Sequence, residues 1–170
     1  MTAQRDRIHR HVSDHPGIHF NQLARELDLA TGQLQYHLKK LRRADDVVSE
    51  SLYGRTHYFT PEYDDWERGA VAVLRRETAR DVLLYLIEDG PSAPAPVADD
   101  LDIARSTLEW HLDHLIEQQL VEKRRDERGR VTLVLARPGE TADLLRLVEP
   151  SVPERLVDRF TRLVDNLVSE

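Results

Sequence analysis

The stretch LDLATGQLQYHLKKL at residues 27–41 decides the fold, because it returns 74 residues later as LDIARSTLEWHLDHL at residues 101–115. Seven positions are identical in the two stretches, Leu29 is matched by Ile103, and Tyr36 is matched by the aromatic Trp110. Similarity at a constant offset indicates two copies of one structural unit. We therefore expect the chain to contain a duplicated domain.

The first copy predicts three helices followed by a β-hairpin. The helices are expected over 5–14, 20–27 and 31–44, with Asn21 and Thr31 as N-caps of the second and third. Strands are expected over 47–52 and 55–60, with Tyr53-Gly54 at the tip of the hairpin. This is the order of a winged helix-turn-helix, in which two short helices, a tight turn and a third helix precede a hairpin.

The second copy predicts the same elements over 78–89, 97–101, 104–119, 121–125 and 130–136. The expected fold class is mainly α with small β-hairpin wings (α+β), with two tandem winged helix-turn-helix domains and C-terminal helices. The expected division is 1–62 for the first domain, 63–77 for a linker helix, 78–137 for the second domain and 138–170 for the C-terminal helices.

The last segment carries an apolar stripe at helical spacing, which consists of Leu156, Phe160, Leu163, Val164 and Leu167. Such a stripe must be buried against another apolar surface. It can pack onto its own domain, or it can form the seam of a two-fold dimer, the commonest oligomer symmetry. We favour a homodimer, because two winged-helix domains leave little free core surface.

The outward face of the third helix in the first copy has the chemistry of a major-groove contact. On a helical wheel, Leu34, Leu38 and Leu41 share the buried face, and polar side chains lie opposite. Glutamine bonds adenine edges, lysine reaches guanine or phosphate, and tyrosine bonds phosphate. The expected DNA contacts on this helix are Thr31, Gly32, Gln33, Gln35, Tyr36, Lys39, Lys40 and Arg43. In the wing, Arg55 is expected to reach the backbone or minor groove, with His57 on the same face of the strand.

The corresponding face of the second copy is acidic, since Glu109, Asp113 and Glu117 stand where the first copy has Gln, Lys and Arg. Phosphates would repel that face, so we expect Trp110 and Ile116 to make a protein contact instead. The hairpin over 121–136 is nevertheless basic. It could contact phosphate, or it could be a solvated wing whose arginines pair with Asp126 and Glu127.

The charge is spread unevenly along the chain. The formal net charge is −7, with nine Lys/Arg and seven Asp/Glu in residues 1–60 and fifteen and twenty-four in residues 61–170. This asymmetry predicts a polyanion partner, here double-stranded DNA, for the first part only. The lysines are Lys39, Lys40 and Lys123 alone, which favours a salt-adapted cytoplasm over the other explanation, a GC-rich genome.

Several classes of function are disfavoured. Without cysteine there is no disulfide, thiol sensor or Cys-ligated zinc. The sequence has no glycine-rich phosphate loop and no Gly-x-Ser-x-Gly, so we expect no enzyme and no catalytic residue. No apolar run reaches the ~20 residues of a membrane span. We expect a soluble cytoplasmic protein without a membrane partner.

Histidines raise the question of a metal site. His11, His15 and His19 are spaced four apart, and the first two would share one face of a helix and could bind Zn²⁺ or Ni²⁺. Pro16-Gly17 interrupts that helix before His19, so we expect no metal and no cofactor. His111 corresponds to His37 in the repeat, which favours a half-buried structural role over a catalytic one.

The run Gln33–Leu41, with Val47-Val48 and a Tyr-Gly wing after it, resembles the ArsR and MarR-like winged-helix regulators. The overall plan resembles the tandem winged-helix regulators of haloarchaea. This resemblance implies that Thr31–Arg43 enters the major groove and that the wing with Arg55 lies on the backbone. We therefore expect a sequence-specific transcriptional regulator, and the alternative is a winged-helix module that binds only proteins. The sequence names no operator and no effector.

Overall fold

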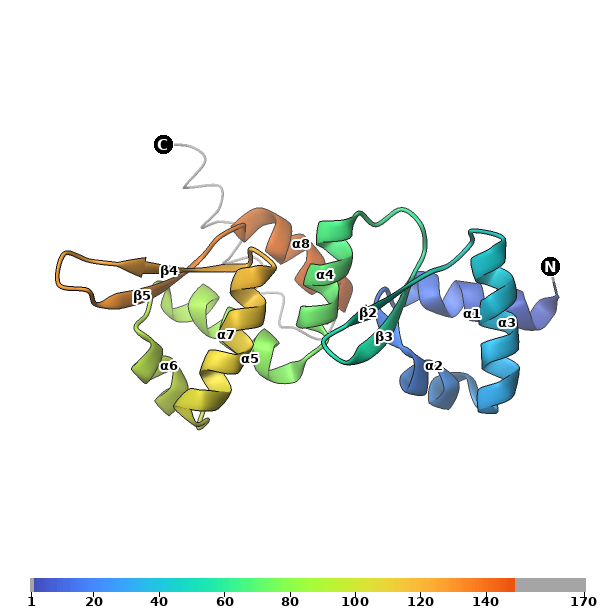
Figure 1. Cartoon of the computed structure of the whole chain (residues 1–170), viewed down its shortest axis with the longest axis horizontal. Coiled ribbons are helices and arrows are strands. Elements are labelled where there is room, and N and C mark those ends of the chain that lie inside the picture. The colour runs from blue at the N-terminus through green and yellow to red at the C-terminus, as the bar shows by residue number, and fades with distance from the viewer. Residues whose placement is uncertain (1, 149–170) are drawn as a thin grey trace. The chain divides into compact units, whose positions relative to one another are not determined.

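The structure is a computed structural model that describes residues 2–148, and the chain divides into two compact units, Met1–Ala72 and Val73–Glu170 (Figure 1). It confirms a mainly helical fold with small β-hairpins. The apolar stripe predicted over 156–167 lies outside the described residues. Among residues 2–148, no helix has the length and apolarity needed to cross a membrane.

The first unit has the expected helix order and one strand more than expected. Its helices are α1 (Ala3–Asp14), α2 (Phe20–Leu27) and α3 (Thr31–Arg43), and α4 (Asp65–Leu74) begins after the sheet. The hairpin strands are β2 (Val48–Leu52) and β3 (Arg55–Phe59). A two-residue strand, β1 (Ile18–His19), pairs antiparallel with β3 and completes a sheet of order β1-β3-β2.

The second unit repeats this plan. Helix α5 (Glu77–Asp89) is followed by α6 (Pro94–Asp100) and α7 (Arg105–Glu117). The strands β4 (Val121–Arg125) and β5 (Val131–Leu135) form a hairpin, after which α8 (Pro138–Val148) begins. Helix α6 starts three residues before the expected 97, because Pro94 stands at its first position, where a missing N–H costs nothing.

The duplication extends to the backbone conformation. Asp28 and Asp102 are both left-handed, with φ of 52° and 54°, and so are Asp45 and Gln119, with φ of 59° and 58°. Each pair is separated by the same 74 residues as the sequence repeat. The hydrogen bond from the Leu29 N–H to the Ala24 carbonyl recurs from Ile103 to Ala98, at 3.0 Å in both units. Both copies therefore make the same turn before the third helix.

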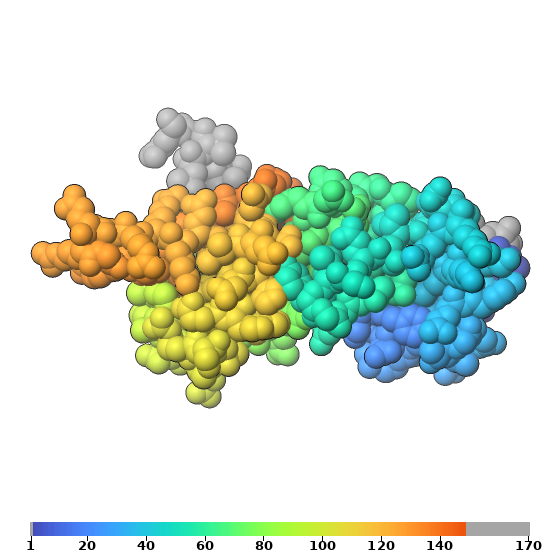
Figure 2. All heavy atoms as spheres, viewed as in Figure 1, coloured from blue at the N-terminus to red at the C-terminus, as the bar shows by residue number. Residues whose placement is uncertain are grey.

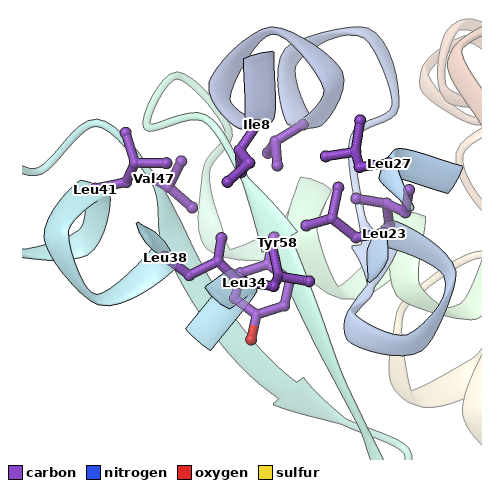
Figure 3. Close-up of a cluster of buried hydrophobic side chains, with 10 residues drawn as sticks. Ile8, Leu23, Leu27, Leu34, Leu38, Leu41, Val47 and Tyr58 are labelled. Carbon is purple, nitrogen blue, oxygen red and sulfur yellow. The ribbon is translucent and has the colours of Figure 1, made fainter. Parts of the chain in front are cut away.

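The core of the first unit is an apolar cluster to which all three helices and the sheet contribute (Figure 3). Ile8 of α1, Leu23 of α2 and Leu34 of α3 are fully buried in it. Their spacing places one side chain from each helix at a common centre, as the apolar periodicity predicts. This packing fixes which face of α3 is turned to solvent.

Both N-cap expectations in the first unit were wrong. The N-caps of α2 and α3 are His19 and Ala30 rather than Asn21 and Thr31, and neither cap uses a side-chain hydrogen bond. The strand β1 was not expected at all. The predicted linker helix over 63–77 corresponds to α4, which ends at Leu74, and its residues as far as Ala72 belong to the first unit. Arg68 of α4 pairs with Glu50 of β2, which attaches the helix to the sheet.

Candidate nucleic-acid interface

Helix α3 presents one polar face to solvent. Its buried side is Leu34, Leu38 and Leu41, which are at most 3% exposed. All eight residues predicted to contact DNA from this helix are exposed, namely Thr31, Gly32, Gln33, Gln35, Tyr36, Lys39, Lys40 and Arg43. The structure thus brings these residues together along one side of a single helix.

The aromatic ring in the middle of this face is held by its neighbours. Tyr36 is 57% exposed, and its ring makes an edge contact with His37 at 5.2 Å between centroids. The Lys40 ammonium lies 5.6 Å from the Tyr36 centroid, within the range of a cation–π contact. The phenol is therefore positioned outward beside a cation, and both groups can contact a phosphate.

A hollow of about 510 Å³ lies between the end of α3 and the start of β2. Lys39, Arg42 and Arg43 line it, together with Asp45, Val47, Val48 and Ser49. Three cations around one concave surface form a site that suits an anion. Arg42 was missing from the predicted contacts, because the helical wheel places it at the side of α3, and only the fold brings β2 against that side.

The wing divides into an exposed tip and a buried base. Arg55 is exposed and pairs with Leu52 next to the turn at Tyr53-Gly54. His57, expected on the same outward face, is only 1% exposed. Its Nδ1 donates to the Gly17 carbonyl at 2.7 Å, which ties the wing to the end of α1. His57 is thus a structural residue rather than a DNA contact.

The matching face of α7 has different chemistry. Lys123 pairs with Glu109 at 2.7 Å, and this hydrogen bond holds the pKa of the Glu109 carboxyl below its usual value, against a smaller opposing effect of burial. Trp110 is 46% exposed, and the guanidinium of Arg76 lies 5.2 Å from its ring centroid. Ile116 is half-buried. Part of the predicted protein-contact surface is therefore covered within the unit itself.

The second wing, β4–β5, projects as a narrow arm from its unit (Figure 2). Several of its cations are engaged with neighbouring carboxylates. Arg130 pairs with Asp126 at 2.7 Å, and Arg124 pairs with Glu122 at 3.6 Å. The pair of Arg130 with Asp126 is one that the solvated-wing alternative predicts.

Comparison with known protein families finds a helix-turn-helix match in each unit. Residues 2–71 match a family described as an N-terminal HTH domain, and residues 74–124 match a family described as a helix-turn-helix domain. An uncharacterized HTH-type transcriptional regulator of Methanocaldococcus jannaschii is 26% identical over 131 residues, which are 77% of this chain and 33% of the relative. The chain therefore spans about a third of the length of that relative.

Solved structures of AbfR are also similar. One has a disulfide formed and is 14% identical, covering 89% of this chain and 100% of its own, with a TM-score of 0.40. Another is reduced AbfR bound to DNA, 15% identical, covering 88% of this chain and 99% of its own, with a TM-score of 0.41. Each unit thus carries a helix-turn-helix match, and with the repeated helix order the chain contains two winged helix-turn-helix domains in tandem.

Proposed function

We propose that the chain is a sequence-specific DNA-binding transcriptional regulator without enzymatic activity, and that α3 is its reading element. The observation that carries this proposal is the contrast between α3 and α7. At matched positions, α3 exposes Lys39 where α7 exposes Asp113. Duplex DNA has one negative charge per ~1.7 Å, so only the α3 face is attracted to it. The two helix-turn-helix matches and the name of the archaeal relative support the same function.

The proposed docking places α3 in the major groove, which admits one α-helix. Gln33 and Gln35, near the N-terminus of the helix, would bond base edges. The hollow lined by Lys39, Arg42 and Arg43 would receive the phosphate backbone at the other end. Arg55 would contact the backbone or the adjacent minor groove from the wing tip.

The test is a mobility-shift assay of the intact protein with genomic fragments, at low salt and at the working salt of the source cell. The regulator function predicts retained binding to a subset of fragments at both salt concentrations, with affinity falling as salt rises. If the protein binds no fragment at either concentration, the alternative remains, in which both winged helices contact only proteins.

Gly32→Ala is expected to change the stability of the protein and its affinity for DNA in opposite directions. A Cβ at Gly32 meets nothing within 4 Å, so alanine is expected to raise the free energy of unfolding by about 0.5 kcal/mol through helix propensity. We propose in addition that the N-terminus of α3 approaches a DNA phosphate closely, and the same methyl group would then stand between them. DNA affinity is therefore expected to fall while the melting temperature rises. A fall in both would mean that the variant is simply less well folded.

We also propose that two copies associate through the C-terminal stripe of Leu156, Phe160, Leu163, Val164 and Leu167. A two-fold dimer would present two copies of α3 to the two half-sites of an operator. Replacing Leu156 and Phe160 together by Asp is expected to convert a dimer into a monomer in sedimentation experiments. Trp110→Ala is measured beside it as a second test variant, because Trp110 belongs to the other predicted contact surface. A wild-type protein that sediments as a monomer at micromolar concentration would contradict the dimer.

A further inference from the structure

We propose that His11, His15 and Glu26 form a binding site for a divalent transition-metal ion such as Zn²⁺. One nitrogen of each imidazole and one carboxylate oxygen of Glu26 lie within 4.8 Å of one another. The histidines occupy the last turn and C-cap of α1, and the glutamate lies near the end of α2. The sequence suggested a set with His19, but His19 lies in β1, in register with His57. The third ligand instead comes from a different helix, which spacing along the chain could not reveal.

The three groups are already close together, and a hydrogen bond donated by His11 Nε2 to Glu26 marks where an ion would replace a proton. His11 Nε2 lies 2.6 Å from Oε2 of Glu26, and the two imidazole rings are stacked with centroids 4.3 Å apart. Tetrahedral Zn²⁺ with bonds near 2.1 Å separates its ligand atoms by about 3.4 Å. An ion between the three atoms therefore requires His11 Nε2 and Glu26 Oε2 to move apart by about 0.8 Å, after loss of the proton between them. A donor set of two imidazoles and one carboxylate, with water in the fourth position, is one that Zn²⁺ accepts.

Outer hydrogen bonds orient two of the three ligands. His15 Nδ1 lies 3.0 Å from the His11 carbonyl, which can only accept, so this nitrogen carries the proton and leaves the lone pair on Nε2. Gln22 Nε2 donates to Oε1 of Glu26 at 2.9 Å, which leaves Oε2 to face the ion. Partners of this kind fix the tautomer and the ring orientation of metal ligands.

The electrostatic surroundings allow a cation. Burial raises the pKa of Glu26, but the hydrogen bonds from His11 and Gln22 act against it, and that pKa lies below its usual value. The carboxylate is therefore ionised at neutral pH, as a ligand must be. A hollow of about 310 Å³ adjoins the site, and it is lined by Arg7, Arg10, His11, Asp14, Glu26 and Leu27. The two arginines oppose a cation there, and the carboxylates of Asp14 and Glu26 offset them.

The site joins α1 to α2 directly before the turn that leads into α3. A metal ion bound there would clamp the two helices that carry the reading helix, and would bind the folded state more tightly than the unfolded chain. Zinc is therefore expected to raise the melting temperature of the first unit.

The experiment is isothermal titration calorimetry of the full chain with zinc chloride, at a salt concentration that screens weak carboxylate binding. One equivalent is expected, and His15→Gln or Glu26→Gln is each expected to weaken binding by roughly a hundredfold or more, since losing even an outer partner costs about 10–100-fold. Gln22→Ala is expected to fall in that smaller range, and His9→Gln, on the same helix but outside the cluster, is expected to bind like the wild type.

Two results would overturn the proposal. One is a wild-type chain that takes up no zinc in a saturable manner. The other is equal zinc affinity in the wild type, His15→Gln and Glu26→Gln, with all three proteins folded by circular dichroism, which would assign the uptake to scattered surface carboxylates. The measurement does not involve DNA, so it stands or fails independently of the function proposed above.

Discussion

Replacing Lys39, Lys40 and Arg43 together by alanine is expected to weaken operator binding by on the order of a thousandfold. Each charged hydrogen bond to phosphate or guanine contributes about 1.5 kcal/mol or more, so three lost contacts amount to about 4.5 kcal/mol. The dependence of log K on log salt is expected to flatten by about 3, since each phosphate contact contributes close to one unit of slope. Fluorescence anisotropy of a labelled operator across a salt series measures both quantities.

The control must distinguish the loss of contacts made by α3 from the change in the net charge of the protein. Lys39→Ala with Lys40→Ala removes two exposed charges from α3, and Arg105→Ala with Arg146→Ala removes two exposed charges from α7 and α8. Both pairs change the net charge equally, but only the first is expected to change the salt slope by about 2. All four side chains are exposed, so the stability of either variant is expected to stay within about 0.5 kcal/mol of the wild type. Equal losses of affinity in the two pairs would show that α3 makes no specific contact.

The sequence predicted those features that depend on local periodicity. Helix α3 was anticipated because Leu34, Leu38 and Leu41 repeat at helical spacing, and burial of that stripe determines the outward face. The second copy followed from a constant offset, and the left-handed residues Asp28 and Asp102 show that the offset applies to the backbone as well. Local pattern was sufficient for these elements, because each helix is long enough to show its period.

Features that depend on contacts between distant segments could not be predicted in this way. Strand β1 has two residues, too few to show alternation, and it exists because Ile18 pairs with Tyr58. Arg42 joins the cationic hollow only where β2 meets the end of α3. Glu26 meets His11 across two helices. In each case a residue gains its role from a neighbour in space, and the number of residues between the two follows no regular pattern.

Gly17→Ala is expected to lower the free energy of unfolding of the first unit by about 2–5 kcal/mol. Gly17 has φ of +78°, and an added Cβ would lie 2.5 Å from Val71 Cγ1 and 3.3 Å from Phe59 Cε1. Both neighbours are fully buried, so neither has room to move. A left-handed backbone costs an L-residue about 1–2 kcal/mol, and overpacking a core costs about 1–3 kcal/mol.

Gly54→Ala isolates the first of these two costs, and for this reason it is the matched variant. Gly54 has nearly the same φ, +79°, but a Cβ there meets nothing within 4 Å. It is therefore expected to lose only the backbone contribution, about 1–2 kcal/mol. Urea unfolding in a Trp110→Phe background, followed by Trp66 fluorescence, reports on the first unit. If Gly17→Ala costs no more than Gly54→Ala, then the end of α1 is not packed against Val71 as tightly as the structure requires, and the attachment of α4 to the first domain would have to be revised.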